Sequence, residues 1–462
     1  MDDSPQARPS LTRRTALRSV AGLAAGGVCV TAASADARTA TVSPTVLTQN
    51  AYVGVDLTRL LDARSLDDVR RIAGDFIDQV DPARYEARAG AIASAIVSAD
   101  ADVVALQEVA TVRTGAARGT DSGGTTTERS GAVLADFLAG IRSALSDRGA
   151  DYEVAAEAVS TEIELPTGSE EAAREVVRLT DRDVLLVRGD HGVRASETGR
   201  YDAGLSLPIL GTDFEFSLRR GYGLADVAVN GVGFTAVSTH LESVSGSIRR
   251  QQAGELLDAL PADGPVVVGG DFNSGPGGPT RTYDHLTSSL NDAYAALRPD
   301  ADGYTCCQAA DLRNDRSQLS RRIDAVLYRG EVSPTGVRRV GHEPEDRVAV
   351  ERDGETVRLW PSDHAGVVAT LDVTGERTAT ASSRATASET TARGSAATDR
   401  QPTAGTGATP TGTSGSRSGP RSGAPATDDG SADASGDAGP GFGVVAGLLG
   451  LAAGLGLHSR RE

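Results

Sequence analysis

Short apolar runs recur along the middle of the chain. Runs of this length that are rich in Val, Ile and Leu are typical of buried strands. They predict strands over residues 45–49, 102–106, 152–158, 183–187, 223–229, 232–239, 266–268, 323–327 and 366–373. Apolar residues at helical spacing predict helices over 84–98, 132–146 and 248–259. Residues 111–131 are rich in Gly, Ser and Thr and predict a loop. Together, the predicted strands and helices over residues 45–373 are expected to form one large domain.

One stretch in this domain carries a distinctive polar ending. The strand over 266–268 continues into Gly269 and Gly270, which let the backbone turn sharply at the strand's carboxyl end. Asp271 and Asn273 follow, two residues apart, so in an extended chain they project to the same side. Such a pair suits chemistry on an oxygen-rich substrate, although an Asp-X-Asn turn that caps its own backbone gives the same pattern.

Comparable polar residues lie next to other predicted strands. Asn50, Glu108 and His240 each follow the carboxyl end of an apolar run, whereas Asp363 and His364 precede one. A single residue of this kind is more often part of a turn that ends a strand. A series of carboxylate, amide and imidazole groups instead predicts strand ends that converge on a site for a hard cation and a phosphate.

Both ends of the chain differ from this domain. Residues 12–17 (TRRTAL) precede an apolar run over 20–33 that is too short to span a membrane, and 35–37 (ADA) offer a small-X-small cleavage site. Residues 1–37 therefore resemble a twin-arginine export signal, with a chance arginine pair as the alternative. Residues 376–439 are dominated by Thr, Ser, Ala, Gly, Pro and Asp, which predicts a disordered Thr/Ser/Gly-rich stalk.

The last segment, residues 440–462, has three parts in order. It starts with Pro-Gly-Phe, continues with an apolar run and ends near two arginines. This order resembles the PGF-CTERM sorting signal of archaeal surface proteins, which implies that the tail is cut and replaced by a lipid. A simple tail anchor is the alternative, and both place the domain outside the cell at the membrane surface.

Charge and cysteine content add two expectations. The formal net charge is -17, and all 46 basic residues are arginine, a composition typical of halophilic archaea in concentrated salt. Salt at that concentration screens long-range repulsion, so the charge does not exclude a nucleic-acid substrate. Cys29 lies in the leader, and Cys306 and Cys307 are expected to be small buried residues of a loop rather than a redox pair or a zinc site.

The polar motifs also resemble, in their order, those of the endonuclease/exonuclease/phosphatase superfamily. The matching residues are Asn50, Gln107-Glu108, Thr239-His240, Gly270-Asp271-Phe272-Asn273, Arg322-Ile323-Asp324 and Ser362-Asp363-His364. The resemblance implies an α/β fold, a four-layer αββα sandwich of two mixed β-sheets flanked by helices. It also implies a metal-dependent phosphoric ester hydrolase.

The resemblance implies a role for each matched residue. Glu108 would be the principal Mg²⁺ or Mn²⁺ ligand, and Asn50 and Asp363 would help to hold the metal directly or through water. Oxygen ligands of this kind suit a hard, octahedral cation.

The other matched residues would act on the phosphodiester. Asp271 would orient or deprotonate the attacking water, and Asn273 would bind the phosphate. His364, oriented by Asp324, would contact the phosphate or transfer a proton, and His240 would supply a second imidazole. We expect Asp271 and His364 to lie at a solvated site.

Three further features are weaker signals. Asp183 is expected either near the site or in a surface turn. Arg249 and Gln252 are expected on a solvated helix face, and residues 305–308 are expected to shape the substrate rim.

The leading hypothesis is a secreted, surface-tethered phosphodiesterase, with nucleic acid as its substrate and the membrane as its anchor. A lipid, sphingomyelin-type or small-molecule phosphoesterase is the first alternative, and a catalytically silent binding module on a stalk is the second. No protein partner is evident, and a monomer is expected.

Overall fold

The computed structural model describes residues 39–116, 131–167, 175–208, 215–276, 281–352 and 354–377. The expected export signal, the sorting segment and the stalk beyond Arg377 lie outside these residues. Within the described ranges, no helix is long and apolar enough to cross a membrane.

The first sheet contains nine strands among the described residues. Its order is β1-β19-β2-β3-β7-β4-β5, with β16 paired to β19 and β6 paired to β7. The parallel pair β2–β3 lies among antiparallel pairs, so the sheet is mixed. The strands are β1 (Thr39–Val42), β2 (Thr45–Asn50), β3 (Val103–Gln107), β4 (Thr111–Ala116), β5 (Ala132–Asp136), β6 (Tyr152–Pro166), β7 (Glu175–Arg188), β16 (Val332–Val340) and β19 (Gly366–Glu376).

The second sheet has the order β14-β15-β13-β12-β11-β8 in the described part of the chain. It is also mixed, because β12 and β13 are parallel and β13 and β15 antiparallel. Its strands are β8 (Gly192–Arg200), β11 (Gly221–Val229), β12 (Val232–His240), β13 (Val266–Asp271), β14 (Asn291–Asp292) and β15 (Asp324–Arg329). Two small hairpins accompany the sheets, β9 (Leu205–Pro208) with β10 (Glu215–Leu218) and β17 (Val348–Arg352) with β18 (Glu355–Leu359).

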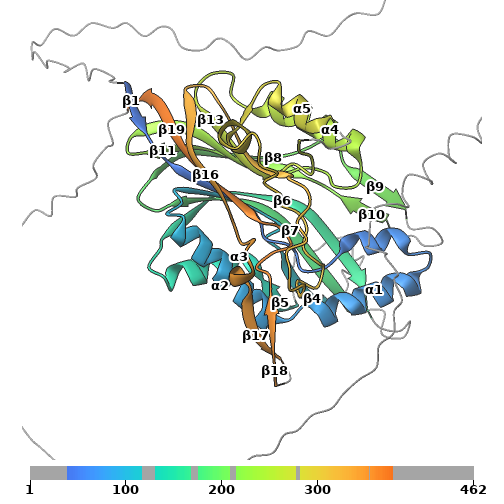
Figure 1. The fold of residues 1–462 in the computed structure, drawn as a ribbon. Helices are drawn as coiled ribbons and strands as arrows, with labels where there is room; N and C mark the ends of the chain where they lie inside the picture. Colours follow the sequence, from blue (N-terminus) through green and yellow to red (C-terminus); the bar gives the residue numbers. More distant parts are fainter. Residues whose placement is uncertain are drawn as a thin grey trace, which may run out of the picture. The chain divides into compact units, whose positions relative to one another are not determined.

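Helices cover the outer face of each sheet (Figure 1). The first sheet packs against α1 (Leu66–Gln79), α2 (Pro82–Ser98) and α3 (Phe137–Ser146), and the second packs against α4 (Gly246–Ala259) and α5 (Thr282–Thr287). The short α6 (Ala293–Leu297) lies against β15 and β16. Two 3₁₀ turns complete the described elements, η1 (Leu57–Asp62) and η3 (Pro344–Asp346).

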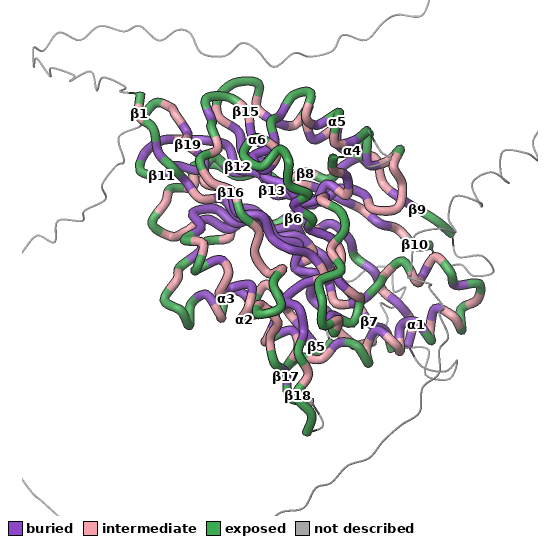
Figure 2. The backbone as a smooth tube through the Cα atoms, in the orientation of Figure 1, coloured by how far each residue is buried: buried purple, intermediate pink, exposed green. Residues whose placement is uncertain are grey.

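The two sheets face each other across a shared apolar core. Side chains alternate along a strand, so Val103 and Ala105 of β3 enter the core between the sheets, whereas Val104 and Leu106 pack against the helices. Both faces are covered, which explains why the central strands are continuous apolar runs that are buried over most of their length (Figure 2). The expected four-layer αββα sandwich is confirmed.

Two expected elements differ. Residues 111–116 form a strand rather than a loop, and 132–136 form a strand rather than the first turns of a helix. These segments pair with each other, and β4 also pairs with β7. Helix α3 begins after them, where the Asp136 side chain accepts a hydrogen bond from the Ala139 N–H. Pairing with distant strands has overridden the local pattern.

The glycines before Asp271 also have a role other than the one expected. Gly269 and Gly270 lie within β13, and neither is among the glycines with positive φ. A Cβ on Gly269 would lie 2.7 Å from the Ala105 Cβ of the facing sheet. The residue is therefore small because the sheets approach closely there, not because the chain turns.

Candidate active site

The strand pairing brings the predicted polar residues to one edge. His240 at the end of β12 lies opposite Asp271 at the end of β13, and Asp271 lies opposite Asp324 at the start of β15. In the other sheet, Asn50 ends β2 and Glu108 follows the parallel strand β3. Parallel neighbours end at the same edge, so each sheet presents its polar residues to the same region.

Asn50 links the two sheets through hydrogen bonds. Its Nδ2 donates to Asp271 Oδ2 at 3.0 Å and to Glu108 Oε1 at 3.1 Å. Its Oδ1 accepts from the Tyr52 N–H at 2.9 Å, which fixes the orientation of the carboxamide. The second oxygen of Glu108 accepts from the Val53 N–H at 2.9 Å. The oxygen of Asn50 is therefore turned toward Tyr52, and its amide nitrogen faces the two carboxylates.

Three residues of this region adopt the left-handed backbone conformation. Tyr52, Glu108 and Asn273 have φ of 60°, 56° and 48°. Such a conformation is costly for residues other than glycine and tends to persist at functional sites. The Asn273 N–H donates to Asp271 Oδ1 at 2.8 Å, so the self-capping Asp-X-Asn turn is present. The Asn273 side chain nevertheless reaches His240, with 3.1 Å between Nδ2 and Nε2.

His364 lies among carboxylates. Its Nδ1 is 2.8 Å from Asp324 Oδ2 and 3.9 Å from Asp271 Oδ2, and its Nε2 is 3.9 Å from Asp363 Oδ1. Burial alone would lower the pKa of His364, but the three carboxylates raise it well above the usual value. Asp271 is 1% and His364 7% exposed, so the expectation of a solvated site is wrong for these two side chains.

The donor set fits a hard divalent cation. Oδ1 of Asp363 and Oδ1 of Asp324 are buried and have no hydrogen-bond partner among the described residues. Asn50 Nδ2 lies 3.1 Å from Glu108 Oε1 and 3.0 Å from Asp271 Oδ2, which brings these two carboxylates together as well. Burial and then nearby Glu108, opposed by His364, raise the pKa of Asp363 to about 7. A cation would compensate these crowded carboxylates, and oxygen ligands are those that Mg²⁺ and Mn²⁺ prefer.

The second imidazole has a different environment. His240 Nδ1 lies 2.8 Å from Arg220 Nη1 and 4.0 Å from Asp183 Oδ1. Asp183 is therefore near the site rather than in a surface turn. The neighbouring Arg182 instead pairs with Glu157 at 2.7 Å. Burial and then Arg220 lower the pKa of His240 well below its usual value.

Arg249 and Gln252 are buried, so the expected solvated helix face is wrong. Arg249 Nη1 donates to the carbonyls of Glu242 and Ser243 at 2.6 and 3.0 Å. Gln252 accepts from the Glu242 N–H at 2.7 Å and donates to the Ala203 carbonyl at 2.9 Å. Both side chains of α4 hold the loop that follows His240.

The sequence pattern does not predict a functional role for Arg88 of α2. It is 2% exposed, and its Nη2 donates to the carbonyls of Ala51 and Tyr52, the latter at 2.7 Å. Its Nε donates to the Pro361 carbonyl at 2.9 Å. Arg88 thus joins the loop after Asn50 to the loop before Asp363.

The segment 305–308 lies beside the site. Cys306 and Cys307 are joined by a disulfide, which differs from the expected pair of small loop residues. Cys306 forms a backbone bridge with His364, and Thr305 Oγ1 accepts from the Asp324 N–H at 3.2 Å. The segment therefore supports the histidine and its carboxylate partner.

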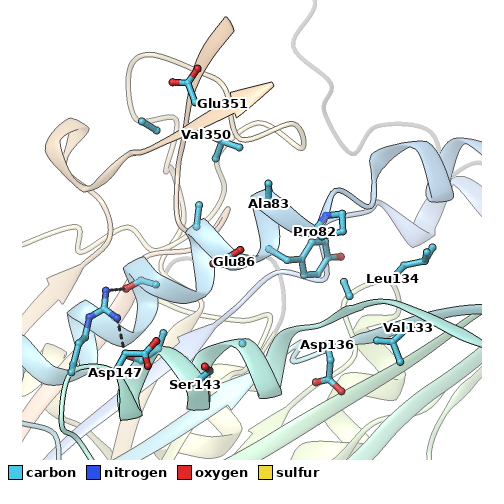
Figure 3. A pocket seen from close by; sticks show the side chains of 18 residues that line it. Pro82, Ala83, Glu86, Val133, Leu134, Asp136, Ser143, Asp147, Val350 and Glu351 are labelled. Carbon is cyan, nitrogen blue, oxygen red and sulfur yellow. Dashed lines mark hydrogen bonds between the residues drawn. The ribbon is translucent and has the colours of Figure 1, made fainter. Parts of the chain in front are cut away.

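A separate pocket of about 820 Å³ lies between α2, α3, β5 and β17 (Figure 3). Its lining includes Glu86, Asp136 and Asp147, but no histidine and none of the residues of the cluster described above. This pocket is therefore separate from the cluster of carboxylates and imidazoles.

One family model and several solved structures are similar to this chain. A model described as "Endonuclease/Exonuclease/phosphatase family" matches residues 47–364. A family protein from Bacteroides thetaiotaomicron is 16% identical, with 73% of this chain and 97% of that chain covered and a TM-score of 0.44. A mannosyl-6-phosphatase from the same organism is 16% identical, with 71% and 99% covered and a TM-score of 0.42. Truncated TDP2 from Caenorhabditis elegans is 16% identical, with 71% and 97% covered and a TM-score of 0.37. A search of curated proteins found no match.

Proposed function

The chain belongs to the endonuclease/exonuclease/phosphatase family, and from this premise we propose that it is a secreted, cell-surface phosphodiesterase that acts on nucleic acid. Members of this family are phosphoric ester hydrolases that generally use divalent metal ions. The observation that carries the proposal is the bridge by Asn50 between Glu108 and Asp271. It gathers carboxylates of both sheets, with His364 within 3.9 Å of Asp271.

The roles follow from the surroundings of each side chain. Glu108 and Asp363 would hold Mg²⁺ or Mn²⁺, with Asn50 contacting it through water. When bound, the metal would neutralise charge on the phosphate as water attacks. Two hydrogen bonds, from Asn50 and from the Asn273 N–H, fix the orientation of the Asp271 carboxylate. In the proposed mechanism, Asp271 orients and deprotonates the attacking water.

The remaining polar groups act on the phosphate. His364 is kept protonated by Asp324 and donates to a phosphate oxygen or to the leaving group. The Asn273 carboxamide and His240 lie beside Asp271 and contribute neutral donors. Such fixed donors stabilise the charge that develops in the transition state.

The proposed location rests on the two ends of the chain. The twin-arginine-like start supports export, and the PGF-CTERM-like ending supports attachment to the surface of a halophilic archaeal cell. Extracellular DNA is an abundant phosphodiester, which favours a nuclease. We also expect a monomer. Mass spectrometry of the mature carboxyl terminus tests the attachment, because an intact Arg460-Arg461 ending would rule out cleavage of the tail.

A substrate panel tests the activity. We expect the purified protein, with Mn²⁺ at high salt, to cleave plasmid DNA and bis(4-nitrophenyl) phosphate. Cleavage of the generic diester and of lipid head-group esters, but not of DNA, would favour the lipid alternative. Turnover of none of them would contradict the enzyme and favour a silent binding module.

A further inference from the structure

Arg220 is a buried guanidinium that faces an active-site imidazole. It precedes β11, is 5% exposed, and places Nη1 2.8 Å from Nδ1 of His240. A guanidinium has only donors, so its neighbour must accept the hydrogen bond. Nδ1 of His240 therefore carries no proton, and the proton of the neutral ring is on Nε2.

The contacts of Nε2 are mixed: Asp271 favours a proton on Nε2, and Asn273 favours an unprotonated Nε2. Nε2 lies 3.4 Å from Asp271 Oδ2, an acceptor, and 3.1 Å from Asn273 Nδ2, which donates to the Leu241 carbonyl at 2.9 Å. The opposite tautomer would let Asn273 donate to Nε2, but it would place an N–H against the Arg220 N–H at 2.8 Å. A hydrogen bond from a charged donor is roughly twice as strong as one between neutral groups, so the contact with Arg220 determines the tautomer of His240.

One buried carboxylate lies beside Arg220, and a second lies near the imidazole that Arg220 faces. Arg220 Nη1 lies 3.5 Å from Asp181 Oδ2, and Asp183 Oδ1 lies 4.0 Å from His240 Nδ1. Burial and then Glu108 raise the pKa of Asp181 to about 6, whereas Arg220 lowers it. The Arg220 guanidinium thus contacts Asp181 and His240 in the interior, and it does not project to the surface.

We propose that Arg220 is a positioning residue that fixes His240 as a neutral imidazole with its proton on Nε2, presented to Asp271 and to the substrate phosphate. The two imidazoles then have separate tasks, because His364 is charged through Asp324 while His240 remains a neutral donor. The catalytic consequence rests on the proposed phosphodiesterase function, whereas the tautomer does not.

Nuclear magnetic resonance tests the tautomer directly. The chain contains 6 histidines, so ¹⁵N-histidine labelling gives few signals, and His240→Gln identifies the signal of His240. In the wild-type full chain we expect a protonated Nε2 and an unprotonated Nδ1. In Arg220→Met we expect both tautomers or a protonated ring. A wild-type His240 with its proton on Nδ1, or an unchanged spectrum in Arg220→Met, would overturn the proposal.

Kinetics test whether Arg220 acts through His240. On bis(4-nitrophenyl) phosphate, we expect Arg220→Met to lower kcat at least about tenfold with KM within about twofold. Arg220→Lys still donates to Nδ1 and should recover most of kcat. Arg200→Gln, on the exposed part of the adjacent strand β8, is the control and should leave kcat unchanged.

A double-mutant cycle separates positioning from a general structural effect. In a His240→Ala background, Arg220→Met should change kcat less than about twofold, because the group through which Arg220 acts is gone. An equal loss in both backgrounds would overturn the proposal. If Arg220→Met does not fold, the spectrum and the kcat of Arg220→Lys are measured instead. A kcat of Arg220→Lys as low as that of His240→Ala would contradict the positioning role. If no diester is hydrolysed, the proposed function fails while the spectrum still decides the tautomer.

Discussion

Asp271 shows how strongly single residues of this site depend on their neighbours. Its carboxylate is buried beside Asp324 and His364, and it accepts hydrogen bonds from Asn50 and from the Asn273 N–H. Burial and then Asp324 raise its pKa to about 6. A buried carboxylate near a like charge lowers the stability of the fold. The carboxylate is retained because the site requires it.

Replacing Asp271 by Asn should therefore separate activity from stability. We expect Asp271→Asn to lower kcat by about 10²–10⁴, because the base is lost. Relief of the buried charge should offset the lost hydrogen bond, so the free energy of unfolding should stay within about 1 kcal/mol. Steady-state kinetics and urea unfolding measure both. Asp258→Asn on the exposed side of α4 is the control, and an equal kcat in the two variants would remove Asp271 from the mechanism.

At the same scale, the sequence indicates some site residues and not others. Asn50, Glu108, His240 and Asp271 could be predicted because each follows an apolar strand. Arg88 and Arg220 could not, since an arginine in a helix or at a strand start is usually solvated and local pattern does not report burial. Their roles depend on contacts with loops that are distant in the sequence.

At the scale of elements, β13 places Asp271 by packing closely against β3. A Cβ on Gly269 would meet Ala105 Cβ at 2.7 Å and Thr48 Cβ at 3.1 Å. Strand positions were predictable from apolar runs, but this close approach was not, because it depends on which strands face each other. For the same reason, β4 and β5 could not be recognised before their partners were known.

Gly269→Ala should consequently be destabilising. We expect a loss of about 1–3 kcal/mol in the free energy of unfolding, because the sheets must separate to admit the methyl group. Gly74→Ala is the matched control, since nothing lies within 4 Å of its Cβ position in α1, and alanine should stabilise that helix by up to about 1 kcal/mol. Denaturant unfolding of both variants checks this, and equal stabilities would refute the packing argument.

Helix α2 contributes through Arg88, which holds loops on both sides of the site. Arg88→Lys keeps the charge but lacks the planar fork whose separate nitrogens reach the carbonyls of both loops. The free energy of unfolding should therefore fall by about 1–3 kcal/mol. Calorimetry should also show a higher Kd for Mn²⁺. Arg84→Lys, one turn earlier in α2, is the control and should leave that Kd unchanged. An unaltered Kd in Arg88→Lys would limit Arg88 to a structural role.

At the scale of the whole molecule, the site exists only when both sheets are assembled. Asn50 and Asp271 are 221 residues apart in the chain, yet their side chains are hydrogen-bonded. A metal at this junction should therefore stabilise the fold, because it binds the native state and not the unfolded chain.

Thermal unfolding measures this coupling. We expect saturating Mn²⁺ to raise Tm by at least about 3 °C and a chelator to reverse the rise. Asp363→Asn should show a smaller rise, because one ligand is weakened. A rise of equal size in Asp363→Asn would place the stabilising ion elsewhere.

The most direct test of the account is the rate of bis(4-nitrophenyl) phosphate hydrolysis as a function of Mn²⁺ concentration. It compares the wild type, Glu108→Gln and the control Glu86→Gln, which alters an exposed residue of α2. We predict saturable activation in the wild type and in the control, and little or no activation in Glu108→Gln. Hydrolysis without metal, or the same Mn²⁺ dependence in all three proteins, would contradict a metal-dependent active site at the junction of the two sheets.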